Sequence, residues 1–215
     1  MQCVSDLSKL RVAARKRVTH LRTLSAGLAA PLSESDRRAL AFVTIELDNL
    51  IVSGLRQFTK SSLLGCRTSA GHRVLSQAAA TAPPQAAARV YAVLNPSGYQ
   101  KLGNPPTIKE EAEIAFRNPA NAEKVLLAYG ATNVATLQFA MGFNAIVFSE
   151  IAKVRHFFAH RAENTNERVR TWATNIGMFS YIDPETSLVA GRPGTGVKIL
   201  DGWLAETENF FDTAL

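Results

Sequence analysis

The chain has 215 residues, of which 47% are hydrophobic, and a formal net charge of +6, so it can build one large domain or two small ones around a buried core. Its two cysteines, Cys3 and Cys66, are too few for a disulfide framework and lack zinc-ligand spacing, which favours a reducing compartment. No apolar run is long enough to span a membrane and the N-terminus lacks a signal-peptide pattern, so we expect a cytoplasmic protein with no membrane partner.

The charge is distributed unevenly along the chain. Residues 1–100 hold 13 Lys and Arg against 5 Asp and Glu, whereas residues 101–215 hold 11 against 13. A basic half suits a polyanionic partner such as RNA. It is weak evidence by itself, because basic proteins that bind no nucleic acid are common.

Helical periodicity dominates the first third of the chain. Residues 4–28 predict a basic helix whose apolar stripe is Leu7, Leu10, Ala14, Val18 and Leu21. A second helix should begin near Ser33, whose hydroxyl can cap it, with Asp36 in the first turn, and should run to about Ser62. This second helix carries two carboxylates, Glu46 and Asp48, on a strongly apolar background.

The pattern changes between residues 65 and 106, where short Ala-rich pieces are broken by prolines and glycines, including Pro83-Pro84. We interpret this segment as an irregular insertion within a single domain of residues 1–215. Beyond it, Thr107 to Glu110 form a capping box and Asn118-Pro119 is a second helix start. The pattern as a whole predicts an all-α fold, a helical bundle.

Three more helices are expected in the last third of the chain. The first spans residues 133–161, with Gly142 as a candidate interruption. The second is opened by Asn164 and Glu167 and ends near Gly177, and the third spans residues 197–214. A turn-rich loop at 181–196, which could contain a short hairpin, separates the last two.

The helix at 133–161 ends in the most informative segment, Arg-His-Phe-Phe-Ala-His-Arg at residues 155–161. Helical spacing places Val147, Ile151, Val154 and Phe158 on one stripe, which we expect to be buried. The opposite face carries a row of small residues around a histidine, namely Ser149, Ala152, His156 and Ala159. Such a face permits a second helix to approach closely.

Two groups in this segment do not share a face. Arg155 and His160 are five positions apart, so on a regular helix they project about 140° from each other. One straight helix cannot easily direct both side chains at one phosphate. Either the helix breaks before His160, or two copies of the chain meet across a symmetric interface and pool their groups.

The Arg-x4-His spacing near the end of an apolar-patterned helix resembles the motif of the HEPN superfamily of RNA-cleaving helical proteins. The resemblance rests on Arg155, on the polar residue after it, His156, and on His160, within the stretch 150–161. It implies a HEPN-like helical bundle that forms a homodimer through the motif helix, with both motifs lining one cleft. The chain departs from the usual pattern in carrying His156 where family members often have Asn.

The same resemblance implies a metal-independent endoribonuclease that needs no cofactor. The 2′-hydroxyl of RNA would attack the phosphate and leave 2′,3′-cyclic phosphate ends. His160 can act as general base or acid near neutral pH, Arg155 can contact two phosphate oxygens, and His156 could position the phosphate or donate a proton. Family members often carry a further polar or acidic residue on an earlier helix, a place that Glu46 or Asp48 could take.

The resemblance leaves the biological role open. Many HEPN ribonucleases are toxins or antiphage defence effectors held in check by a partner protein, so an inhibitory partner is expected beside RNA. HEPN-like domains that have lost catalysis serve instead as RNA-binding or scaffolding modules in larger complexes, and this second class of function remains an alternative.

Three other interpretations compete with catalysis. His156 and His160 have the i, i+4 spacing of metal ligands, but no general base stands between them, and Glu150, Glu163 or Glu46 could become a third ligand only through the tertiary fold. Cations at a helix C-terminus also interact favourably with its free carbonyl groups without any chemistry. The segment 191–198 resembles a phosphate-binding loop only superficially, since its lysine is displaced and no Ser or Thr follows it.

Overall fold

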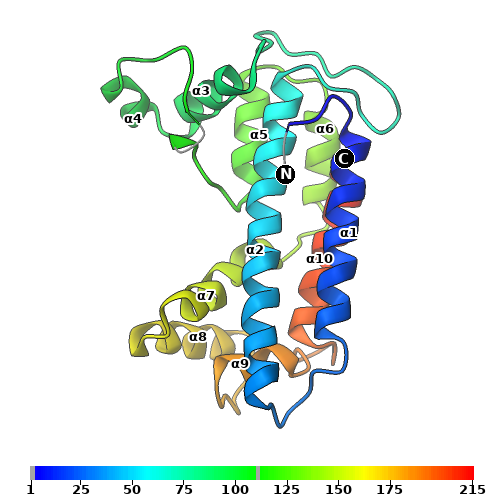
Figure 1. The fold of residues 1–215 in the computed structure, drawn as a ribbon, viewed down its shortest axis with the longest axis vertical. Coiled ribbons are helices and arrows are strands. Elements are labelled where there is room, and N and C mark those ends of the chain that lie inside the picture. The colour runs from blue at the N-terminus through cyan, green and yellow to red at the C-terminus, as the bar shows by residue number, and fades with distance from the viewer. Residues whose placement is uncertain (1–2, 110–111) are drawn as a thin grey trace. The chain divides into compact units, whose positions relative to one another are not determined.

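A computed structural model describes residues 3–109 and 112–215, and in this range the chain forms α-helices and no β-strand (Figure 1). The helices are α1 (Leu7–Ser25), α2 (Glu34–Leu63), α3 (Pro83–Leu94), α4 (Pro96–Lys101), α5 (Pro119–Ala128), α6 (Val134–Met141), α7 (Val147–His160), α8 (Glu163–Asn175), α9 (Pro184–Val189) and α10 (Ile199–Ala214). The predicted all-α class is therefore confirmed. No helix of the described residues is long and apolar enough to cross a membrane.

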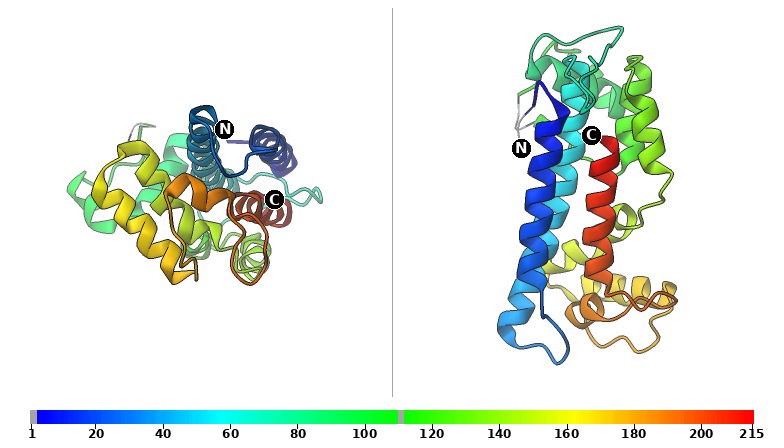
Figure 2. Two further views of the ribbon diagram at one scale, coloured as in Figure 1. Left: turned by 90° about the horizontal axis from the view of Figure 1, so that it is seen from below. Right: turned by 90° about the vertical axis from the view of Figure 1, so that its right-hand side faces the viewer.

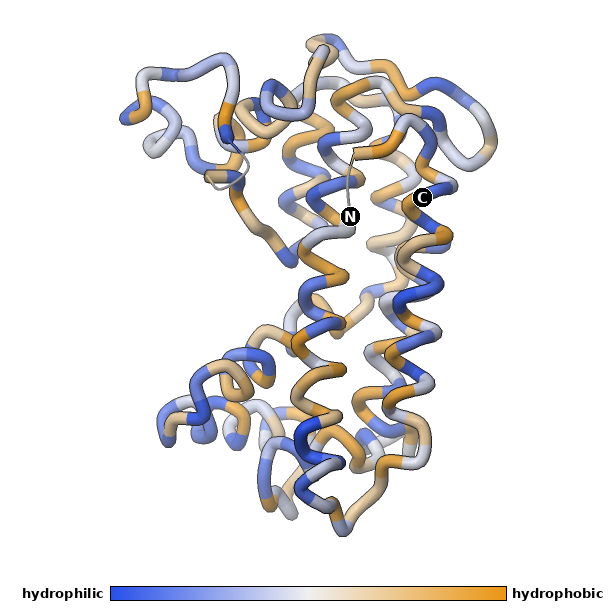
Figure 3. Tube along the Cα trace, in the orientation of Figure 1, coloured by the Kyte–Doolittle hydropathy of each residue, from blue (hydrophilic) through white to orange (hydrophobic). Residues whose placement is uncertain are grey.

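The chain divides into two compact units. The first contains residues 1–15, 51–144 and 210–215, and the second contains residues 16–50 and 145–209. The boundaries fall inside α1, α2 and α10, so each of these helices contributes residues to both units. Along these helices apolar and polar residues alternate (Figure 3), as expected where one face is buried.

The first unit contains the start of α1, the end of α2, the helices α3, α4, α5 and α6, and the end of α10. Its core includes Leu7, Leu10, Leu55, Phe58, Val125, Leu126, Leu137, Phe210 and Phe211. Gly54 of α2 lets the ring of Phe211 of α10 approach the helix closely. A Cβ atom at this position would lie 2.4 Å from the ring carbon Cζ.

The second unit packs α7, α8 and α9 with parts of α1, α2 and α10. Its core includes Val18, Leu21, Leu40, Val43, Leu47, Val147, Ile151, Val154, Trp172 and Trp203. The ion pair between Arg17 of α1 and Glu46 of α2 (2.7 Å) joins these antiparallel helices. α7 and α8 form a helical hairpin and lie side by side in both views of Figure 2.

Most of the predicted helix limits agree with the structure. The Ser33 hydroxyl accepts a hydrogen bond from the Asp36 amide (3.2 Å), and the Asn118 side chain accepts one from the Ala120 amide (2.9 Å), so both predicted caps are present. The five residues predicted as the stripe of the first helix are all buried. The helix predicted at 133–161 is interrupted at residues 142–146, where Asn144 has a φ of 49°.

Other local predictions need correction. Pro83-Pro84 begins α3 rather than breaking a helix, because proline is tolerated in the first turn. The helix predicted to open at Asn164 begins one residue earlier, at Glu163, because the Thr165 hydroxyl accepts a hydrogen bond from the Ala162 amide (3.2 Å). The loop predicted at 181–196 contains α9, and its Gly191 forms an antiparallel bridge with Lys198, just beyond the predicted loop.

One predicted feature falls partly outside the described range. Glu110, the last residue of the predicted capping box, is not among the described residues, and residues 113–118 form no helix.

Candidate functional site

The motif helix α7 is held in the second unit by its predicted apolar stripe. Val147, Ile151 and Val154 are fully buried, and Phe158 is 7% exposed. Since these four side chains face the core, the other faces of α7 are available for the polar groups of the motif.

The N-terminal end of α7 is anchored by a polar cluster that sequence reasoning did not find. The buried carboxylate of Glu150 pairs with Arg192 and accepts a hydrogen bond from the Trp203 indole N–H (3.0 Å). Glu206 accepts one from the Val147 amide (2.8 Å), and burial raises the pKa of Glu206. Glu150, considered above as a metal ligand, therefore positions the helix.

Arg155 lies beside a buried carboxylate from α2. Its Nε atom is 3.5 Å from Oδ2 of Asp48, whose side chain is 2% exposed, whereas the Arg155 side chain is 34% exposed. The contact is an ion pair rather than a hydrogen bond, because Arg155 Nε has no hydrogen-bond partner among the described residues. Of the two carboxylates that could accompany the motif, Asp48 is the one beside Arg155, and Glu46 pairs with Arg17.

The two histidines of the motif lie against each other with their rings tilted. The ring centroids of His156 and His160 are 4.5 Å apart with an interplanar angle of 59°. His156 is half-buried and His160 is exposed. Burial, followed by the positive charges of His160, Arg168 and Arg155, lowers the pKa of His156, so its neutral form predominates near neutral pH.

α7 remains helical through His160. Its end is marked by Arg161, which has a left-handed conformation (φ 44°) and whose amide donates to the Phe157 carbonyl oxygen (2.6 Å). The helix therefore does not break before His160, so the possibility that a break directs Arg155 and His160 at one phosphate is wrong. Within one chain Arg155 contacts Asp48, while the exposed His160 lies against the half-buried His156.

The row of small residues on α7 is incompletely covered within the chain. Ser149 and Ala159 are exposed, whereas Ala152 and His156 are half-buried. The row thus remains accessible to another surface at both ends.

The hairpin of α7 and α8 creates a groove next to the motif. Residues that line it are Lys153, Asn164, Glu167, Arg168, Thr171, Trp172 and Asn175, around a volume of about 440 Å³. Trp172 is 3% exposed, and its indole N–H is buried without a partner among the described residues. Arg168 belongs both to this groove and to the charges around His156.

Sequence reasoning missed this groove, although one signal was present. A short connection between two predicted helices indicates an antiparallel hairpin, and antiparallel pairing of α7 with α8 would have suggested that Arg168 lies near His156.

The phosphate-loop and metal-site interpretations gain no support from the described residues. Lys198, the lysine of the phosphate-loop-like segment, donates to the Leu28 carbonyl oxygen (2.8 Å), so it serves the local structure. Among the described residues, no group of three or more His, Cys, Asp and Glu side chains gathers in a metal-binding arrangement.

Comparison with known proteins found no match. No protein-family model matches the chain, and neither the curated proteins nor the solved structures contain a match to it. The geometry of the site and the motif itself are therefore what bears on function.

Proposed function

We propose that this chain is a metal-independent endoribonuclease that acts as a homodimer through α7. The observation that supports it best is the grouping, on one helix, of an arginine beside a buried carboxylate and of two imidazoles whose rings lie 4.5 Å apart. An arginine and two imidazoles are sufficient for RNA cleavage, because RNA supplies its own nucleophile.

The proposed reaction moves two protons. The 2′-oxygen attacks phosphorus and gives its proton to a neutral imidazole, while the 5′-oxygen leaves with a proton from an imidazolium ion. His156 is the better base because its lowered pKa keeps it neutral, and His160 then protonates the leaving oxygen. The product is a 2′,3′-cyclic phosphate and a 5′-hydroxyl.

Arg155 would stabilise the charge that develops on the phosphoryl oxygens. A guanidinium group has five N–H donors, so contact with Asp48 through Nε leaves donors for a phosphate. A buried carboxylate also orients the guanidinium before substrate arrives, and such preorganisation is the main source of electrostatic stabilisation in active sites.

The groove between α7 and α8 offers a place for the RNA strand beside the motif. Lys153 and Arg168 line the groove and supply positive charge for phosphates. Strand and motif would then meet at Arg168 and His156.

The test is cleavage of a defined RNA by the purified full-length chain, with analysis of the product ends. We expect 2′,3′-cyclic phosphate ends, unchanged activity in EDTA, and no cleavage of DNA of the same sequence. His160→Ala should abolish activity, whereas His20→Ala, which alters an exposed histidine of α1, should not.

Two outcomes would replace the proposal. RNA binding without cleavage by the folded chain would favour the alternative of a non-catalytic RNA-binding or scaffolding module. Activity lost in chelator and restored by zinc or manganese would favour a metal site at His156 and His160.

If the chain is a toxin or defence effector, its expression should arrest growth of a heterologous host, and His160→Ala should relieve the arrest.

A further inference from the structure

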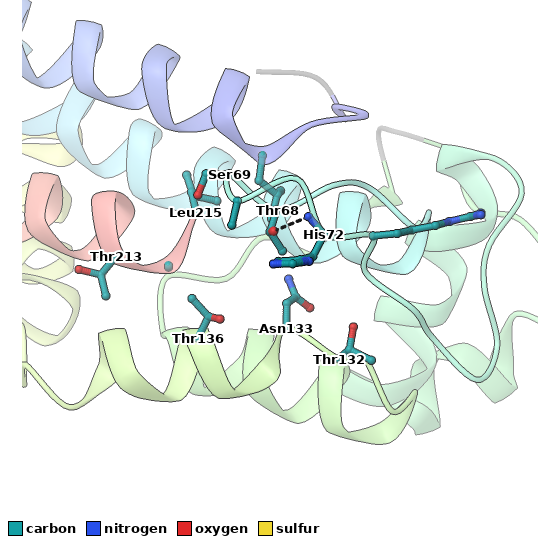
Figure 4. A pocket seen from close by; sticks show the side chains of 12 residues that line it. Thr68, Ser69, His72, Thr132, Asn133, Thr136, Thr213 and Leu215 are labelled. Carbon is teal, nitrogen blue, oxygen red and sulfur yellow. Dashed lines mark hydrogen bonds between the residues drawn. The ribbon is translucent and has the colours of Figure 1, made fainter.

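A second cavity lies in the first unit, among residues that the proposed ribonuclease mechanism does not use. It has a volume of about 390 Å³ and lies between the start of α1, the loop after α2, the start of α6 and the end of α10 (Figure 4). Its polar lining includes Thr68, Ser69, His72, Arg73, Asn133 and Thr136. The volume falls within the range of small-molecule sites.

Asn133 provides the decisive observation. It occupies the N-cap position of α6, is 5% exposed, and makes no cap hydrogen bond with its side chain. Its Nδ2 atom donates to the Ser62 hydroxyl oxygen (2.8 Å), while its Oδ1 atom is buried without a partner among the described residues. Figure 4 shows the side chain directed into the cavity.

The orientation of the Asn133 amide follows from its neighbour. The Ser62 hydroxyl donates its hydrogen to the Phe58 carbonyl oxygen (2.9 Å), so toward Asn133 it can only accept. Asn133 must therefore present its NH₂ group to Ser62, which leaves Oδ1 as a buried acceptor on a residue that lines the cavity. A ligand whose N–H or O–H group reaches this atom would give it the partner that buried polar atoms almost always have.

The rest of the lining selects for negative charge. Arg73 and His72 line the cavity and are exposed, and no Asp or Glu side chain lines it. Hydroxyl groups of Thr68, Ser69 and Thr136 add further donors. A phosphate group, with its several acceptor oxygens, can satisfy more of these donors than a carboxylate can.

We infer that this cavity binds a phosphate ester of nucleotide size, with the phosphate beside Arg73 and His72 and a sugar hydroxyl or base amino group donating to Asn133 Oδ1. Leu7, Ala70 and Ala214 supply the apolar surface against which a ring can pack. The inference does not depend on ribonuclease activity, since the cavity and the motif helix belong to different units.

The test is calorimetric titration of the full-length chain with the four ribonucleoside monophosphates, ribose 5-phosphate, adenosine and inorganic phosphate. At least one phosphate ester should bind about tenfold or more tightly than either adenosine or inorganic phosphate, because the ester alone engages both ends of the cavity. The His160→Ala variant should bind equally well, which separates this result from the outcome of the cleavage assay.

Variants locate the site. Arg73→Ala should weaken binding of the ester about tenfold or more without threatening the fold, because the side chain is exposed. Lys101→Ala, which removes an exposed cation outside the cavity, should leave binding unchanged. Asn133→Ala should weaken binding of the ester but not of inorganic phosphate; if that variant does not fold, Arg73→Ala decides alone.

Three results would overturn the inference. They are the absence of binding by any of the esters at millimolar concentration, binding of inorganic phosphate as tight as that of the best ester, and ester binding that is unaffected by Arg73→Ala.

Discussion

At the scale of single residues, the candidate site consists of side chains with different surroundings. Arg155 is partly exposed beside the buried Asp48, His156 is half-buried among positive charges, and His160 is exposed. These surroundings predict different consequences when each residue is replaced.

The first prediction concerns His160 and Arg155. His160→Ala should lower RNA cleavage by about 10²- to 10⁴-fold and leave thermal stability unchanged, since the side chain is exposed. Arg155→Lys should lower cleavage too, because lysine lacks the planar fork, but it keeps a cation beside Asp48. Single-turnover rates and melting temperatures measure both effects, and near-normal cleavage by folded His160→Ala would refute its catalytic role.

Arg155→Ala should act on stability as well as on activity. It removes a cation from the buried Asp48 carboxylate, and we expect a loss of about 1–3 kcal/mol in the free energy of unfolding, less than for a fully buried pair because Arg155 is about a third exposed. Arg155→Lys is therefore the better variant for testing catalysis.

The second prediction concerns the pKa of His156. An NMR titration should give a value below the usual one of about 6.5, because burial and nearby positive charge disfavour the imidazolium ion. Arg168→Gln removes one of these charges and should raise the pKa of His156. If His156 is the base, the acidic limb of the pH–rate profile then moves to higher pH, and a limb that does not move would argue against this assignment.

At the scale of the helices, packing determines which substitutions each position tolerates. Gly54 in α2 and Gly202 in α10 are both helical glycines, but only the first faces a ring: a Cβ at Gly54 would overlap Phe211, whereas nothing lies within 4 Å of a Cβ at Gly202. The same substitution should therefore have opposite signs at the two positions.

The third prediction follows from that contrast. Gly54→Ala should lower the free energy of unfolding by about 1–3 kcal/mol through overpacking, despite the higher helix propensity of alanine. Gly202→Ala should raise it by about 0.5–1 kcal/mol. Denaturant unfolding of both variants measures the difference, and stabilisation by Gly54→Ala would show that Phe211 can move away.

At the scale of the whole molecule, one chain leaves the proposed catalytic groups on two sides of α7. Because the helix stays regular through His160, pooling of groups from two chains remains the explanation that the proposal requires. The exposed ends of the row at Ser149 and Ala159 are where a second copy of α7 could approach.

The fourth prediction tests this assembly. Ala159→Glu should keep each chain folded, because Ala159 is exposed, but should split the dimer by placing an unpaired charge in the interface, and cleavage should be lost with it. Ala205→Glu, the same change at an exposed alanine of α10, is the matched control and should do neither. Light scattering that shows an active monomer would contradict pooling.

A mixing experiment provides the fifth prediction. Chains that carry Arg155→Lys and chains that carry His160→Ala should each cleave RNA more slowly than the unaltered chain, but heterodimers retain one intact Arg155 and one intact His160 that can face the same cleft. Partial recovery of activity on mixing is expected, and its absence, with heterodimers shown by mass spectrometry, would indicate that each chain needs its own complete motif.

The sequence by itself determined the longer helices and the motif of this protein. The limits of α2 and α5 follow from caps at Ser33 and Asn118, and the buried face of α7 follows from the spacing of Val147, Ile151, Val154 and Phe158. These features depend on contacts within a few residues along the chain, and local periodicity and capping express such contacts directly.

Only the tertiary structure decided which polar groups accompany the motif. Asp48 rather than Glu46 lies beside Arg155, Glu150 pairs with Arg192, and Arg168 comes close enough to His156 to affect its pKa. On α2, Glu46 and Asp48 are two positions apart and so point to different sides. Which of them meets α7 depends on how the helices pack against one another, and that rotation is set by the whole apolar core rather than by any local pattern.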